Sequence, residues 1–287
     1  MLRSSFRIQT VSFQNDSEMS ILRDDRLAFG AGTKARKFFG IHRELETKKI
    51  RSIVLQGELH SNALGAFSFL FRVFGYEVYT IAYARNLSKV TANSVLVKRN
   101  SHRLEIFSSR KEWENRIESF STTNEESVLI PEYGMCSAAT NGLDFLWKRI
   151  QISEYDRLVL DIGSGLVWLS ANDSFGKRIP IYGVSVGLPK RKMIPWLEEK
   201  QKSLGFTNFV LDSEKIIESP FSSGFGSENP QVLEYSKSFY QKNGILLEPI
   251  YSANSVAAVQ SRIDSGEWKG RTLYLHQGGL LNFLDRF

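Results

Sequence analysis

Apolar and polar positions alternate along this chain in two kinds of block, short apolar runs and longer stretches with helical spacing. The runs predict strands at 51–57, 77–83, 103–108, 127–131, 156–163, 179–186 and 271–277, after two strands that open the chain within residues 6–25. The longer stretches predict helices at 34–47, 61–74, 91–99, 110–120, 137–150, 195–204, 230–242 and 254–265, with a short one after residue 163. Because strands that are apolar almost throughout are typical of parallel sheets covered on both faces, the pattern predicts an α/β protein.

Length and composition limit how this chain can fold. At 287 residues it is near the size at which one hydrophobic core stops growing, so we expect one large domain or two intertwined domains. The loops after predicted strands, "QGELHSN", "PEYGMCS", "IGSGLV" and "HQGG", are rich in glycine, serine and asparagine. Ligands bind outside the carboxyl ends of strands in open α/β sheets, so the chemistry is expected in these loops.

Charge and cysteine content exclude several classes of protein. The net charge is +6, but the basic groups are scattered, and the denser ones at 98–103 and 189–193 lack interleaved aromatic residues, so no nucleic-acid partner is expected. Cys136 is the only cysteine, which excludes an intrachain disulfide and a thiolate metal cage. The sequence has neither an apolar leader region nor a run of about 18 apolar residues. We therefore expect a soluble, cytoplasmic protein with no membrane partner.

Common catalytic motifs are missing or weak. "GAGTKA" matches the dinucleotide fingerprint only superficially, because no apolar strand leads into it, and the Walker A spacing is absent. The four histidines have no metal-ligand spacing, so no metal site is predicted.

Two short stretches leave alternatives open. In "AFGAGTKARKFFG", Lys34 lies where a glycine-rich loop turns into a helix, although a cation is disfavoured at the positive end of the helix macrodipole. It is either a solvated lysine of a basic helix, beside Lys37, Lys48 and Lys49, or a lysine whose function uses that position. "DIGSGLV" is either a plain strand-to-helix turn or an anion site built from backbone N–H groups and the Ser164 hydroxyl.

Seven motifs in order resemble one enzyme family. They are "ILRDD", "GTKARKF", "QGELHSNALGAF", "IPEYG", "DIGSG", "LEPIYSANS" and "LHQGG", and they span residue 21 to the end. In this order they are similar to the pyridoxal-phosphate enzymes that include 1-aminocyclopropane-1-carboxylate deaminase and D-cysteine desulfhydrase. The resemblance implies the tryptophan synthase β-like fold (fold type II): two intertwined α/β domains with mostly parallel sheets, the cofactor between them. It implies a larger cofactor-binding domain of residues 1–44 plus 145–287, a smaller inserted domain of residues 45–144, and a homodimer.

The resemblance also implies roles for individual residues. Lys34 would form the internal aldimine with pyridoxal 5′-phosphate, and it can do so only when its amine is neutral, which desolvation and the positive helix end both favour. Ser61 would meet the substrate carboxylate and Asn62 the 3′-oxygen of the cofactor. Tyr251 would be an acid–base or nucleophilic residue, and Ser252 would face the pyridine nitrogen. The phosphate-binding loop would comprise Gly163, Ser164, Gly165, Leu166 and Val167.

More ordinary interpretations exist for several of these residues. Ser61 and Asn62 could form only a helix cap, since serine is a preferred N-cap. Tyr251 could pack in the core with its hydroxyl at the rim. "HQGG" could serve close packing near the cofactor, and Cys136 is expected to be an inert small residue.

The chain departs from the family pattern at several positions. Thr33 stands in place of asparagine before the lysine, and Ala63 in place of glutamine or histidine after "SN". Leu166 and Val167 remove a glycine and a hydroxyl from the phosphate loop. Two further changes are Phe225 in place of a second active-site tyrosine and Asn254 in place of a lysine.

The function that the resemblance implies is a pyridoxal-phosphate-dependent lyase or deaminase acting on a small amino acid. A D-cysteine desulfhydrase-like α,β-elimination is preferred over opening of the cyclopropane ring, since Phe225 lacks the tyrosine hydroxyl. A serine at the ring nitrogen would make a milder electron sink, which suits β-elimination. The alternatives are a catalytically impaired family member that serves as a binding protein, and a pyridoxal-phosphate enzyme with a different amino-acid substrate. The sequence does not identify the substrate or its stereochemistry.

Overall fold

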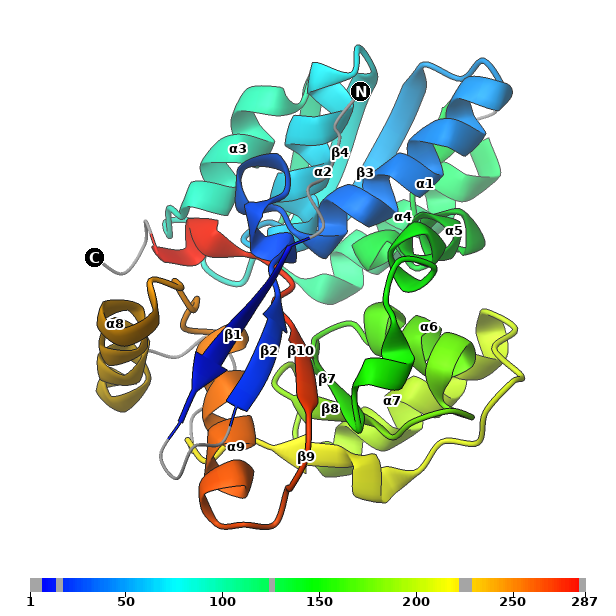
Figure 1. Cartoon of the computed structure of the whole chain (residues 1–287). Coiled ribbons are helices and arrows are strands. Elements are labelled where there is room, and N and C mark those ends of the chain that lie inside the picture. The colour runs from blue at the N-terminus through cyan, green and yellow to red at the C-terminus, as the bar shows by residue number, and fades with distance from the viewer. Residues whose placement is uncertain (1–6, 14–17, 124–126, 222–228, 284–287) are drawn as a thin grey trace. The chain divides into compact units, whose positions relative to one another are not determined.

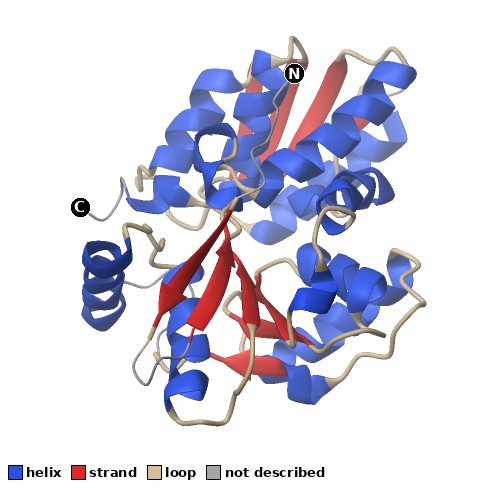
Figure 2. Ribbon diagram, in the orientation of Figure 1, coloured by secondary structure: helices blue, strands red, loops and turns tan. Residues whose placement is uncertain are grey.

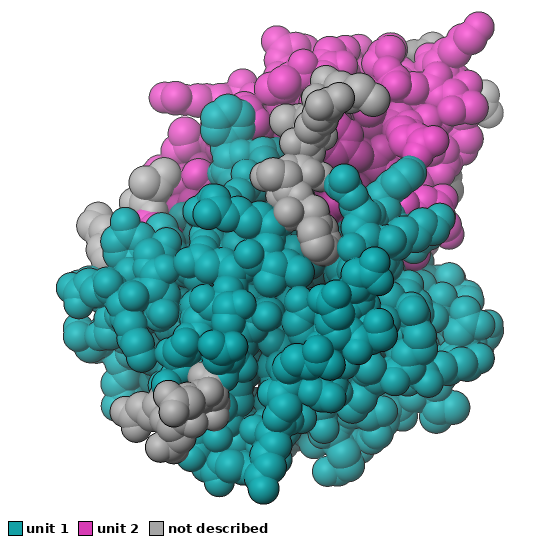
Figure 3. Space-filling view, viewed as in Figure 1, with its two compact units in different colours: residues 1–33, 144–280 teal, residues 34–143, 281–287 magenta. Residues whose placement is uncertain are grey.

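The computed structural model describes residues 7–13, 18–123, 127–221 and 229–283. The chain divides into two compact units (Figure 3). Unit 1 comprises residues 1–33 and 144–280, and unit 2 comprises residues 34–143 and 281–287. The predicted domain boundary at 44/45 stays a prediction; it differs from this division mainly in the unit to which it assigns residues 34–44.

Unit 1 contains a six-stranded sheet (Figure 1). Its strands lie in the order β1 (Ile8–Ser12), β2 (Glu18–Leu22), β10 (Thr272–Leu275), β7 (Arg157–Ile162), β8 (Ile181–Ser185) and β9 (Ile216–Glu218). β1 and β2 are antiparallel, and all the other neighbours are parallel. β7 therefore has a parallel neighbour on each side, which explains why its sequence is apolar almost throughout.

Among the described residues, four α-helices belong wholly to unit 1. They are α6 (Leu166–Phe175), α7 (Lys190–Ser203), α8 (Pro230–Asn243) and α9 (Ser252–Asp264). Both α6 and α9 pack against the central strands β7 and β8. The buried core includes Val159 and Val184 of the sheet together with Val256 and Val259 of α9.

Unit 2 is built on a four-stranded parallel sheet, with its strands in the order β5 (Arg103–Phe107), β4 (Glu77–Tyr83), β3 (Ser52–Glu58) and β6 (Val128–Leu129). Figure 2 shows the helices that accompany these strands. They are α1 (Thr33–Thr47), α2 (Asn62–Val73), α3 (Ala92–Asn100), α4 (Arg110–Thr123) and α5 (Ser137–Trp147), of which α1 and α5 cross the unit boundaries.

Helix α1 is held tightly on two sides within unit 2. Phe38 makes edge-to-face contacts with Phe71 and Phe74 from α2 and its C-cap, at centroid distances of 4.8 and 4.9 Å. On the α5 side, a Cβ on Gly40 or Gly142 would overlap a backbone carbonyl of the other helix. Only glycine permits this approach, so the two helices cross with their backbones in contact.

The structure corrects several predicted elements. Helix α7 begins at Lys190 rather than residue 195, with Pro195 inside it. Strand β6 has two residues where five were predicted, and β9 was not predicted at all. Helix α9 begins at Ser252, two residues before the predicted start. The other α-helices and strands in the described residues lie where the hydrophobic pattern predicts them, with shifts at their ends.

Candidate active site

Lys34 is the second residue of α1, and its side chain is half-buried. The loop before it approaches the segment after β10 very closely. Gly32 has a φ of +62°, and a Cβ there would overlap the carbonyl oxygen of Gln277. Gly278 has a φ of +83°, and a Cβ there would lie 2.6 Å from the carbonyl oxygen of Gly30. The glycine-rich stretch thus packs backbone to backbone on "HQGG", which accounts for its glycines without a bound dinucleotide.

Lys37, one helical turn after Lys34, is not a surface residue. Its side chain is 4% exposed, and its Nζ donates a hydrogen bond to the carbonyl oxygen of Tyr133 at 3.2 Å. Burial lowers the pKa of Lys37 to about 7, and the nearby Lys34 charge acts in the same direction. Lys48 and Lys49 are exposed. Of the three lysines that the sequence places near Lys34 on or beside a basic helix, Lys37 is thus buried.

The predicted phosphate loop opens a helix in unit 1. β7 ends at Ile162, and α6 begins at Leu166 after Gly165, whose φ of +95° suits glycine. Trp196 Nε1 donates a hydrogen bond to the carbonyl oxygen of Ser164 at 2.9 Å and so holds the turn. Leu166 and Val167 are buried, so the first turn offers backbone N–H groups rather than side chains. Such a helix start favours an anion.

Tyr251 lies against this loop within unit 1. It is the N-cap residue of α9, and a Cβ on Gly163 would come within 3.0 Å of the Tyr251 ring. Ser252 is fully buried, and its hydroxyl donates a hydrogen bond to the carbonyl oxygen of Glu248 at 3.2 Å. Unit 1 thus brings together the predicted loop and Tyr251.

Glu248 is a residue that the sequence analysis missed. Its buried carboxylate accepts hydrogen bonds from the backbone N–H groups of Ile250, Tyr251 and Ser252. An acidic side chain at the N-terminus of a helix is favourable because it meets unpaired N–H groups and the positive end of the macrodipole. Glu248 therefore sets the backbone position of Tyr251. The sequence feature that could have indicated Glu248 is an acidic residue four positions before the first residue of α9.

Asn254, one of the departures from the family pattern, also stabilises this turn. Its Nδ2 donates to the carbonyl oxygens of Pro249 and Ile250, and its Oδ1 accepts a hydrogen bond from Ser219. The side chain is buried. The amide therefore takes a structural place at the start of α9.

In unit 2, Ser61 and Asn62 follow β3 at the start of α2. The Ser61 hydroxyl accepts a hydrogen bond from the N–H of Leu64 at 3.1 Å, so Ser61 does cap the helix, as the more ordinary interpretation expected. Asn62 Oδ1 accepts a hydrogen bond from Asn93 Nδ2 at 2.8 Å. Asn93 Nδ2 also bonds the carbonyl oxygen of His60, which fixes the turn. No local pattern in the sequence indicates Asn93, which lies 31 residues from Asn62.

Two carboxyl groups lie at the carboxyl ends of the unit 2 strands. Burial raises the pKa of Glu58 to about 7, with a further contribution from the Glu132 charge, and the N–H of His60 opposes the rise. That N–H donates to Glu58 Oε2 at 2.9 Å. Glu132 pairs with Arg110 at 3.3 Å. Glu58 therefore titrates near neutral pH, three residues before Ser61 in the chain.

Phe225 lies outside the described residues. Burial raises the pKa of the Cys136 thiol, which disfavours the reactive thiolate. Among the residues that the structure describes, no three side chains of histidine, cysteine, aspartate or glutamate gather as they would around a metal ion. Within the same part of the chain, no helix combines the length and apolar character needed to cross a membrane.

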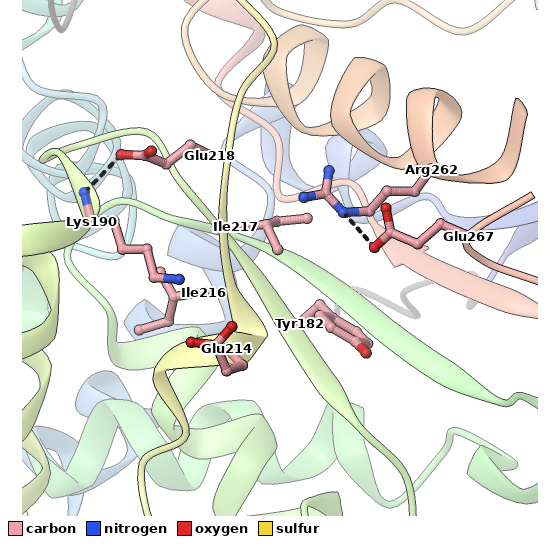
Figure 4. Close-up of a pocket in the computed structure, with 8 residues that line it drawn as sticks. All are labelled: Tyr182, Lys190, Glu214, Ile216, Ile217, Glu218, Arg262 and Glu267. Atoms are coloured by element: carbon pink, nitrogen blue, oxygen red, sulfur yellow. Dashed lines mark hydrogen bonds and ion pairs between the residues drawn. The ribbon is translucent and has the colours of Figure 1, made fainter. Parts of the chain in front are cut away.

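A hollow of about 430 Å³ lies elsewhere on unit 1 (Figure 4). Three of its charged side chains have partners: Arg262 pairs with Glu267 at 3.5 Å, and Glu218 accepts a hydrogen bond from the backbone N–H of Lys190. It lies beside β9 and near the C-terminal end of α9, and it contains none of the predicted site residues. Ten residues of helix, about 15 Å, separate Arg262 from Ser252. Its lining residues are Tyr182, Lys190, Glu214, Ile216, Ile217, Glu218, Arg262 and Glu267.

Comparison of the sequence with known proteins gives relatives of similar length. No family model matches the chain. A protein of Thermotoga maritima named "Putative 1-aminocyclopropane-1-carboxylate deaminase" is 24% identical over 285 residues, covering 91% of this chain and 88% of the relative. The resemblance predicted from the seven motifs is thus confirmed at the level of sequence.

Comparison with solved structures confirms the predicted fold class. A crystal structure described as the ACC deaminase homologue matches with a TM-score of 0.79 and 19% identity, covering 96% of this chain and 90% of that one. A pyridoxal 5′-phosphate-dependent aspartate racemase matches with a TM-score of 0.69 and 10% identity, covering 96% of this chain and 90% of that one. The chain has the mixed α/β fold, with mostly parallel sheets, of fold type II enzymes.

Proposed function

We propose that this chain is a pyridoxal-phosphate-dependent lyase or deaminase that acts on a small amino acid. A relative of similar length is named "Putative 1-aminocyclopropane-1-carboxylate deaminase", and a structural neighbour is described as pyridoxal 5′-phosphate-dependent. The order of the seven motifs along the chain supports the same class.

One observation carries the proposal. The predicted phosphate loop and the predicted carboxylate-binding segment each open a helix, α6 after β7 and α2 after β3. Each of these strands lies in the interior of its own sheet and has parallel neighbours on both sides. Both helix starts favour anions, and the proposed reaction brings two: the phosphate of the cofactor and the carboxylate of the amino acid.

The residues present fit the cofactor. Gly163, Ser164 and Gly165 supply a turn at a helix start with backbone donors and one hydroxyl, and no side chain caps the first turn of α6. Leu166 and Val167 are buried and bring no polar group of their own to those donors. Lys34 is the lysine that would carry the cofactor. When bound, pyridoxal 5′-phosphate supplies an electron sink for the Cα carbanion of the substrate.

The chain's own residues would bind and orient the substrate and move its protons. Lys34 Nζ would take the proton from the substrate Cα. Ser61 and the N–H groups at the start of α2 would bind the substrate carboxylate, and Asn62, held by Asn93, would meet the 3′-oxygen of the cofactor. Tyr251 Oη would move a proton to the leaving group. Ser252 is proposed to face the pyridine nitrogen.

The preferred reaction is a D-cysteine desulfhydrase-like α,β-elimination. The Cα–H and Cβ–S bonds break, sulfide leaves with a proton, and water releases ammonia to give pyruvate. This choice rests on Phe225, which lacks the tyrosine hydroxyl that the family uses in ring opening. A cytoplasmic location and a homodimeric state remain predictions.

The proposal is tested by the visible absorption of purified protein after addition of pyridoxal 5′-phosphate. Wild-type protein should develop a visible band, and Lys34→Ala should lack it because no amine remains to bind the cofactor covalently. Lys48→Ala, which removes an exposed lysine just after the same helix, is the matched control and should keep the band.

Release of keto acid from a panel of D- and L-amino acids then identifies the substrate. D-Cysteine should give pyruvate and sulfide. Wild-type protein that stays colourless with an excess of added cofactor would contradict the enzyme proposal and leave the binding-protein alternative.

A further inference from the structure

Gln277 lies in the terminal "LHQGG" motif, to which the proposed reaction assigns no role. It follows β10 by two residues and is buried. Its side chain lies between two other buried residues of unit 1, Thr33 and Asp161. These residues are 128 positions apart in the chain, so a contact that joins them fixes two distant segments to each other.

On one side, Gln277 holds the residue before Lys34. The Thr33 N–H donates to the backbone carbonyl of Gln277 at 3.1 Å, and the Thr33 hydroxyl donates to Gln277 Oε1 in a longer bond of 3.4 Å. Gly32 lies on the same carbonyl, where a Cβ would overlap it. Thr33 is also the position at which this chain departs from the asparagine of the family pattern. Its hydroxyl and Gln277 form a pair.

On the other side, Gln277 holds the strand that leads into the predicted phosphate loop. Its Nε2 donates to the carbonyl oxygen of Asp161 at 2.8 Å. Asp161 is itself fixed, since the Tyr274 hydroxyl donates to Asp161 Oδ1 at 2.8 Å. Gly163 follows only two residues later. A displacement of Asp161 along the strand would therefore carry the start of the loop with it.

We propose that Gln277 is a positioning residue, which sets the spacing between Thr33 and Asp161 and thereby the fit of the cofactor at its two points of attachment. The inference rests on the proposed function, in which Lys34 holds one end of pyridoxal 5′-phosphate and the Gly163–Gly165 turn holds the other. Once the lysine holds one end of the cofactor, a fixed spacing keeps the phosphate close to its turn. The phosphate then binds at a high effective concentration, which raises the affinity of the protein for the cofactor. If the spacing varies, this added affinity from the phosphate is lost.

The test compares two probes that differ only in the phosphate, pyridoxal 5′-phosphate and pyridoxal, by titrating the visible band of purified full-length protein. Pyridoxal uses only the lysine, so its uptake does not depend on the spacing. In Gln277→Met, which keeps the volume and removes both side-chain hydrogen bonds, the preference for pyridoxal 5′-phosphate over pyridoxal should fall about tenfold, the effect of one or two lost hydrogen bonds. Uptake of pyridoxal itself should not change.

The matched control is Gln260→Met on α9. Gln260 accepts a hydrogen bond from Tyr235 at 2.8 Å, far from both attachment points in the chain, and its loss should leave the preference unchanged. Thr33→Val provides a second variant: combined with Gln277→Met, it should lower the preference by no more than Gln277→Met alone, because both changes break the same pair.

The outcomes separate the inference from the proposed function. An unchanged preference in Gln277→Met overturns the positioning role. An equal loss of uptake of the two probes overturns it too, since a general loss of folding lowers the uptake of both alike. Wild-type protein that forms a band with neither probe overturns the proposed function and the inference with it.

Discussion

Two lysines one turn apart on α1 differ in their surroundings, and this difference is the reason why Lys34 rather than Lys37 is proposed to bind the cofactor. Lys34 is half-buried beside the glycine loop, whereas Lys37 is buried and bonded to the Tyr133 carbonyl. Lys37 is neutral for part of the population at pH 7, so it has the chemical form of a nucleophile. It lacks access to solvent. Lys34 is therefore proposed as the cofactor lysine because of its accessible position at the start of α1, not because of the charge state of its amine.

Lys37 should make stability depend on pH above neutrality. Its pKa is about 7 in the folded protein against 10.5 in the unfolded chain, so between these values the unfolded chain binds more protons and a rising pH favours folding. Lys37→Met removes this dependence. It should stabilise the protein at pH 7, and its advantage over wild type should shrink by about 3 kcal/mol between pH 7 and pH 10. Urea unfolding of both proteins over that range measures the difference.

Lys48→Met is the control for this series. Lys48 is exposed and pairs with Glu44 on the surface, where such pairs contribute at most about 1 kcal/mol. Its unfolding free energy should follow wild type at each pH. If the unfolding free energy of Lys37→Met also changed with pH as that of wild type does, the pKa of the buried amine would not be lowered as described.

At the scale of elements, the crossing of α1 and α5 fixes the helix that carries Lys34. Gly142→Ala would place a Cβ in overlap with the Arg36 carbonyl oxygen. In an unobstructed helix, replacing glycine by alanine stabilises by up to about 1 kcal/mol, but overpacking costs about 1–3 kcal/mol, so the substitution should destabilise the protein. Thermal unfolding monitored by circular dichroism shows whether Gly142→Ala lowers or raises the unfolding temperature.

Asn141→Ala on the same helix is the matched control. Asn141 is exposed, and alanine is the better helix former, so this substitution should be neutral or slightly stabilising. A Gly142→Ala protein as stable as Asn141→Ala would show that the helices do not meet backbone to backbone.

Elements with a long periodic pattern could be predicted, and short or atypical ones could not. β4 and α2 lie close to their predicted ranges because their apolar spacing is complete. The start of α7 was predicted five residues too far along the chain because proline is common in the first turn of a helix. Pro195 instead occupies an interior position, five residues after Lys190. β9 has three residues, too few to form a pattern.

At the scale of the whole molecule, the order of motifs was enough to predict the fold class, because each motif follows a strand or opens a helix. The supporting contacts of the site could not be predicted. Gln277 reaches Asp161 across 116 residues and Asn62 reaches Asn93 across 31, and no local pattern encodes such pairs. The roles of Lys34, Ser61, Asn62, Tyr251 and Ser252 stay predictions.

The most direct test of the central claim is to locate the covalent attachment. Protein loaded with pyridoxal 5′-phosphate is reduced with borohydride, digested and mapped by mass spectrometry. The account predicts one modified lysine per chain, at Lys34. Modification at Lys37 instead, or spread over surface lysines with none favoured, would contradict it.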